Sequence, residues 1–142
     1  MTEATVSTPR TSPDKSSVHR LKVIVVEDFK KIRETIVKTL SGLDMDVFEA
    51  DNGLDALKVL DGRSVDLVMT DLVMPELDGF ELCEEIRRRA NTRNLPIVVI
   101  STHRDAKYVI RALRCGADDY LTKPFTAAAA ERIVERVMNN VQ

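Results

Sequence analysis

The sequence predicts a doubly wound α/β fold, in which five parallel strands form one sheet with helices on both faces. Two observations support this fold class. From residue 21 onward, short apolar runs alternate with segments of helical periodicity, and the alternation occurs five times. Near-continuous apolar runs are typical of strands that are buried on both faces, as in a parallel sheet. The expected strands are residues 22–26, 46–50, 66–70, 96–100 and 119–122.

The first half of the chain contains two strand–helix units. After the first strand, apolar residues recur at helical spacing over positions 29–40, and Gly42 is placed to end that helix. A short strand follows at residues 46–50. The turn Asn52-Gly53 then opens a helix with leucines at positions 54, 57 and 60, which is expected to end near residue 62.

Three further units complete the pattern. Asp78-Gly79 closes a loop after the third strand and precedes a helix with apolar residues from 80 to 86. Pro96 opens the fourth strand, and the helix over 105–115 ends at Gly116. After the fifth strand, the alanine-rich segment 127–141 is a strong helix former.

The composition is that of one ordinary domain. A chain of 142 residues buries about 70% of its unfolded surface without a disulfide or metal. Charged residues make up 31% of the chain but their net charge is only -2, so no basic surface for nucleic acid is predicted. We expect a cytoplasmic protein without membrane insertion, with Cys83 and Cys115 reduced. Residues 1–20, rich in Ser, Thr and Pro, are expected to form a disordered tail before a domain at 21–142.

Polar side chains stand at the ends of four of the expected strands. Glu27 and Asp28 follow the first, Asp71 the third, Ser101 the fourth and Lys123 the fifth. The carboxyl ends of parallel strands share one edge of the sheet, so we expect these groups to converge there. Carboxylates about 4 Å apart repel by about 4 kcal/mol at an effective dielectric constant of 20, and one lysine cannot neutralise three of them. This all-oxygen donor set therefore predicts a site for Mg²⁺, or alternatively Mn²⁺.

Asp71 is the expected phosphoryl acceptor of this site. It ends the central strand, with the acidic pair on one side and Ser101 and Lys123 on the other. A carboxylate attacks phosphorus to form an acyl phosphate when a cation offsets the charge repulsion. Because an acyl phosphate is labile, the modification suits a temporary signal.

Four segments resemble the receiver domain of bacterial two-component response regulators. They are VVED at 25–28, MTDLVMP at 69–75 with DG at 78–79, the strand and serine at 96–101, and GADDYLTKPF at 116–125. The resemblance covers residues 21–140. It implies a flavodoxin-like sheet of strand order 2-1-3-4-5 and a stand-alone receiver of the chemotaxis type.

The resemblance also implies a role for each acidic residue. Asp71 would take a phosphoryl group from a histidine of a sensor kinase or of a phosphotransfer protein. Asp28 and Asp71 would bind Mg²⁺ directly, Glu27 would assist through water, and the backbone carbonyl of Val73 would be a further ligand.

The remaining implied roles concern the phosphoryl group and the switch. Lys123 would pair with Asp71 or its phosphate, and Ser101 would donate a hydrogen bond to a phosphoryl oxygen. The ring of Tyr120 would then turn into the space that the serine hydroxyl leaves. Thr102 stands where the family usually has Ala or Gly, so we expect slower phosphoryl entry and slower hydrolysis. His103 is expected to be an exposed loop histidine rather than a catalytic one.

We expect the partner surface to lie on the fourth helix, fifth strand and fifth helix. Lys107, Arg111 and Arg114 lie at i, i+4 and i+7 on that helix, where they would meet an acidic protein target or form a solvated face. We expect a monomer or a phosphorylation-dependent dimer. The arginines at 87–89 end the third helix, where cations favour the macrodipole, so direct nucleic-acid contact is not expected.

The sequence argues against two other classes of function. A phosphatase with an aspartyl-phosphate intermediate would need a general acid two residues after the nucleophile, where Val73 stands. A flavin or nucleotide carrier would need a phosphate-binding loop after the first strand, where Glu27 and Asp28 would repel the phosphate. We therefore expect no enzyme beyond slow self-dephosphorylation. A receiver-like module that binds partners without phosphorylation remains the alternative.

Overall fold

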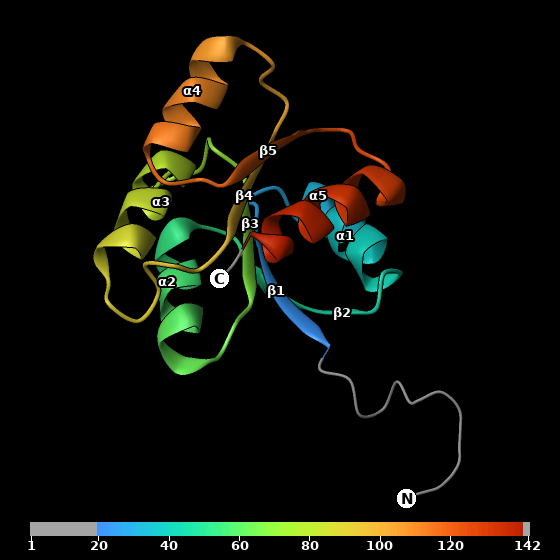
Figure 1. The fold of residues 1–142 in the computed structure, drawn as a ribbon, viewed down its shortest axis with the longest axis horizontal. Helices are drawn as coiled ribbons and strands as arrows, with labels where there is room; N and C mark the ends of the chain where they lie inside the picture. Colours follow the sequence, from blue (N-terminus) through green and yellow to red (C-terminus); the bar gives the residue numbers. More distant parts are fainter. Residues whose placement is uncertain (1–19, 141–142) are drawn as a thin grey trace, which may run out of the picture.

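Strands and helices alternate along residues 20–140, which are the residues that the computed structural model describes (Figure 1). The expected tail lies outside the described residues except for Arg20. The strands are β1 (Leu21–Val26), β2 (Met45–Ala50), β3 (Leu67–Thr70), β4 (Ile97–Ser101) and β5 (Asp119–Thr122). The helices are α1 (Lys30–Ser41), α2 (Gly53–Gly62), α3 (Gly79–Arg88), α4 (Ala106–Arg114) and α5 (Ala127–Asn139).

The five strands form one sheet in the order β2-β1-β3-β4-β5, and every neighbouring pair is parallel. This confirms the predicted fold class and strand order. The register brings strand ends together: Val26 lies opposite both Ala50 and Thr70, and Ser101 lies opposite Thr122. The residues that follow these strands therefore meet at one edge of the sheet.

Two apolar cores cover the two faces of the sheet. Alternate residues of a strand point to opposite faces. In β1, Ile24 and Val26 pack with α2, α3 and α4, while Val23 and Val25 pack with α1 and α5. Figure 1 shows the same division of the helices between the two sides of the sheet. Within residues 20–140, no helix has both the length and the apolar character needed to cross a bilayer.

Polar caps and glycines stand at several of the helix ends. Asn52 caps α2, and Asp78 forms a reciprocal capping box with Glu81 at the start of α3. Gly42 is the C-cap of α1 as expected, but its φ of -71° is right-handed. Gly116, which follows α4, has a φ of +116° that favours glycine. Local hydrogen bonds therefore fix the starts of α2 and α3.

Candidate functional site

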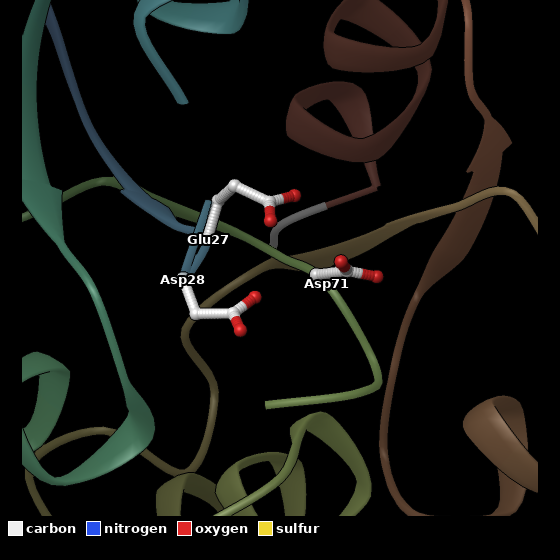
Figure 2. A group of neighbouring side chains, drawn as sticks. All are labelled: Glu27, Asp28 and Asp71. Atoms are coloured by element: carbon white, nitrogen blue, oxygen red, sulfur yellow. The ribbon is translucent and has the colours of Figure 1, made fainter. Parts of the chain in front are cut away.

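Three carboxylates form a cluster at the carboxyl edge of the sheet. Glu27 and Asp28 extend from the end of β1 toward the side on which Asp71 follows β3 (Figure 2). One carboxylate oxygen of each residue lies within 4.8 Å of those of the other two. Glu27 is fully buried, and burial together with the charge of Glu27 raises the pKa of Asp28. The three carboxylates therefore lie together, as the positions of the strand ends predict.

Lys123 connects two of these carboxylates. Its Nζ donates to Glu27 Oε1 at 2.7 Å and to Asp71 Oδ2 at 3.1 Å, and its side chain is only 11% exposed. Burial acts to lower the pKa of this ammonium, but the two carboxylates together outweigh burial and raise it. One fixed positive charge therefore stands among three negative ones, which leaves the cluster negative.

Hydrogen bonds and close packing against Gly79 fix the backbone around Asp71. The Asp71 amide donates to the Val26 carbonyl at 3.0 Å, and Asp71 Oδ1 accepts from the Leu72 amide at 2.7 Å. Gly79 at the start of α3 packs on this segment so closely that a Cβ there would collide with the Asp71 carbonyl oxygen and lie 2.8 Å from Leu72 Cα. The Asp-Gly pair indicated only a turn in the sequence. Its close approach to the residue after β3 was not predicted.

Ser101 and Thr102 lie on the other side of Asp71. Ser101 is buried at the end of β4; its hydroxyl accepts from the His103 amide at 3.1 Å, and its carbonyl accepts from the Lys123 amide at 2.8 Å. Thr102 is exposed and lines a cavity of about 420 Å³ between α1 and the segment that contains Lys123 and Pro124. Thr102 therefore stands at an opening that it shares with Lys123.

Tyr120 lies against the loop between β4 and α4. Its hydroxyl donates to the His103 carbonyl at 2.8 Å, and burial raises the pKa of its phenol while the Ser101 hydroxyl lowers it. The ring is thus already directed toward the loop. His103, expected to be an exposed loop residue, is partly buried and stacks on Tyr108 with ring centroids 4.2 Å apart. No sequence signal distinguishes this stacked pair.

The basic residues of α4 are not equivalent. Lys107, Arg111 and Arg114 are all exposed, but among these three, within residues 20–140, only Arg111 is found over an aromatic ring at close range, with its guanidinium 3.9 Å from the centroid of the Phe80 ring on α3. Arg111 therefore contributes to packing between two helices as well as to the charge of the face. Val73, which follows Asp71 in the β3–α3 loop, has 64% of its surface exposed.

The donor set at the cluster fits a hard divalent cation. Its three ligating groups are all carboxylates, which suit Mg²⁺ or Mn²⁺ better than zinc or copper. A dication would balance the excess negative charge that one lysine leaves on three carboxylates. The residues present are thus able to hold Mg²⁺.

Comparisons with known proteins agree with this geometry. Residues 23–137 match the family described as the response regulator receiver domain. The chain is 35% identical over 120 residues to chemotaxis protein CheY1 of Helicobacter pylori, covering 83% of this chain and 97% of that protein. It is 32% identical over 129 residues to the probable transcriptional regulator ycf27 of Cyanidium caldarium, covering 91% of this chain but 51% of the regulator. The chain therefore spans about half the length of some curated relatives and nearly all of others.

A solved structure is also similar. The receiver domain of a sensor histidine kinase from Pseudomonas aeruginosa matches with a TM-score of 0.79 and 28% identity, covering 86% of this chain and 100% of that one. That structure has a magnesium ion coordinated in its active-site cleft. Receiver domains are phosphoacceptor modules of two-component signalling rather than enzymes, and they interact with histidine kinases. On the family match and the fold together, this chain belongs to the response regulator receiver domains.

Proposed function

We propose that this chain is a phosphorylation-controlled receiver in which Asp71 accepts a phosphoryl group from a histidine of a sensor kinase or phosphotransfer protein. The observation that carries this proposal is the position of Lys123, whose ammonium donates to Asp71 from within a cluster of three carboxylates. A structural ion pair would need one carboxylate. Two additional ones are costly unless a further cation joins the site.

In this proposal, Asp28 and Asp71 bind Mg²⁺ directly, Glu27 acts through water, and the Val73 carbonyl is a further ligand. The magnesium in the similar Pseudomonas aeruginosa receiver supports this assignment. Mg²⁺, when bound, offsets the repulsion between the Asp71 carboxylate and the incoming phosphoryl oxygens. Lys123 supplies a second positive charge at Asp71 Oδ2 and is fixed by its bond to Glu27.

The transfer itself forms one bond and breaks one bond. A carboxylate oxygen of Asp71 attacks the phosphorus, the bond from phosphorus to the donor imidazole nitrogen breaks, and the imidazole keeps that electron pair. The Ser101 hydroxyl then donates to a phosphoryl oxygen, and Lys123 pairs with the new phosphate. Tyr120 and the loop at His103 pass the change to the α4-β5-α5 face, which we propose binds the protein target.

Acid-quenched intact-mass measurement with acetyl phosphate tests this function. The wild type should gain one phosphoryl group in the presence of Mg²⁺ and none in EDTA, while Asp71→Ala should gain none. Asp105→Ala is the matched control, since Asp105 is exposed and makes no side-chain cap for α4, and it should behave as the wild type. A wild type without any gain, or an equal gain in Asp71→Ala, would favour the phosphorylation-independent binding module.

A further inference from the structure

We infer that Arg33 is a positioning residue for the magnesium site, acting through the peptide bond that joins Glu27 to Asp28. This inference rests on the proposed function, because it concerns how the chain directs two of the proposed ligands. Arg33 is not one of the residues that the sequence singled out, and it contacts neither the Asp28 nor the Asp71 carboxylate through any hydrogen bond identified within residues 20–140.

The guanidinium of Arg33 is fixed by two hydrogen bonds. Nη1 donates to the Glu27 carbonyl oxygen at 2.8 Å, and Nε donates to Glu49 Oε1 on β2 at 2.9 Å. The side chain is only 15% exposed, while Lys30 and Lys31 on the same helix are exposed. Because the guanidinium is planar and rigid, two bonds determine its orientation.

The start of α1 explains why this contact matters. The N-cap residue Phe29 makes no side-chain cap, and the first turn of α1 contains no acidic residue. A helix start usually depends on such a cap to satisfy its first amides and to fix the entering chain. Here Arg33 reaches back from the helix to the Glu27 carbonyl, so it holds the turn that carries Glu27 and Asp28.

A purely electrostatic role and a positioning role for Arg33 predict opposite effects of its removal on the affinity for Mg²⁺. A positive side chain near a cation site opposes cation binding, so its removal by itself should tighten binding of Mg²⁺. If Arg33 positions the carboxylates, its removal should weaken binding, because residues that orient metal ligands typically change metal affinity by about 10-fold or more when replaced. The sign of the change therefore distinguishes the two effects.

The test compares R33Q with a matched control, R20Q. Arg20 makes the same pair of bonds at the opposite end of β2, from Nε to Asp46 at 2.8 Å and from Nη2 to the Met45 carbonyl at 3.1 Å. The dissociation constant of Mg²⁺ is measured by isothermal titration calorimetry on the 142-residue chain, after circular dichroism has shown that each variant is folded. We expect R33Q to raise the Kd about 10-fold and R20Q to leave it unchanged.

A second readout separates positioning from general loosening of the fold. At saturating Mg²⁺, the rate of phosphoryl gain from acetyl phosphate should return to the wild-type value in R33Q, since the defect lies in metal affinity. A Kd for R33Q equal to or below that of the wild type would overturn the inference.

If R33Q does not fold, R33K takes its place. Lysine keeps the charge but cannot make both bonds in the same plane, so a higher Kd supports the inference and an unchanged Kd overturns it. Failure of the wild type itself to bind Mg²⁺ would instead contradict the proposed function, and this outcome is distinct from the others.

Discussion

Replacing Asp28 with Asn is expected to stabilise the metal-free protein. Lys123 donates to Glu27 and Asp71, so Asp28 is the member of the cluster to which, within the described residues, this lysine makes no hydrogen bond. Asparagine keeps an acceptor oxygen of similar size and removes the charge. The substitution therefore isolates the electrostatic cost of placing the third carboxylate in the cluster.

The magnitude follows from the separation of the carboxylates. The carboxylate oxygens lie within 4.8 Å of one another, and two unit charges at this upper limit repel by about 3.5 kcal/mol at an effective dielectric constant of 20 and by about 0.9 kcal/mol in water. Asp28 is partly exposed, so we expect a gain of about 1–2 kcal/mol in the free energy of unfolding in EDTA. Mg²⁺ should reverse the order, because the wild type gains about 2.7 kcal/mol at a Mg²⁺ concentration 100 times its Kd, and a variant without this ligand gains less.

Urea denaturation followed by circular dichroism, in EDTA and in Mg²⁺, measures both effects. In EDTA, the midpoint of Asp28→Asn should lie about 0.5–1 M above that of the wild type. Asp105→Asn makes the same charge change at an exposed residue outside the cluster, and it should leave the midpoint unchanged in both solutions. If Asp28→Asn is no more stable than the wild type in EDTA, repulsion within the cluster is not a net cost and the argument for a cation site loses its physical basis.

Four other predictions concern single residues, namely Gly79, Thr102, Arg87 and Cys83. Gly79→Ala places a Cβ against the Asp71 carbonyl, so it should cost about 1–3 kcal/mol in urea denaturation and slow phosphoryl gain. Thr102→Ala should speed both gain and loss of the phosphoryl group in acid-quenched mass measurements, and equal rates would contradict its role in access. Arg87→Ala removes donors to three carbonyls and one carboxylate, which should cost about 2–3 kcal/mol in urea denaturation. Burial raises the pKa of Cys83 to about 12, so iodoacetamide at pH 8 should modify it, as read by mass, only after unfolding in urea.

The strands were predictable because their apolar runs are buried on both faces. The differences lie at the boundaries. Asp66 and Pro96 were expected to begin strands, but β3 and β4 each begin one residue later. Asp66 accepts the Lys22 amide through its side chain at 2.8 Å, and proline has no amide to donate to a sheet. Such boundaries depend on individual hydrogen bonds that periodicity does not report.

The candidate site, like the fold, could be predicted from the sequence only in part. Glu27, Asp71 and Lys123 could be brought together from the sequence because the parallel register aligns the strand ends. Arg33 could not be found, since its contact with Glu27 depends on the entry angle of α1 and on a partner, Glu49, on a third element. Contacts that arise from how helices pack on a sheet leave no local pattern in the chain.

The loop between β4 and α4 connects the site to α4, the helix that buries the fewest residues. Ala112 is the one buried residue of α4, so this helix has little apolar surface to hold it in place. The Ser101 hydroxyl accepts from the His103 amide and can donate its own hydrogen to a phosphoryl oxygen at the same time. A shift of Ser101 toward phosphorylated Asp71 would therefore pull His103, and through the stacked ring of Tyr108 it would pull α4. Because the cores hold the other helices more firmly, we expect the movement to be largest in α4, on the face proposed for the target.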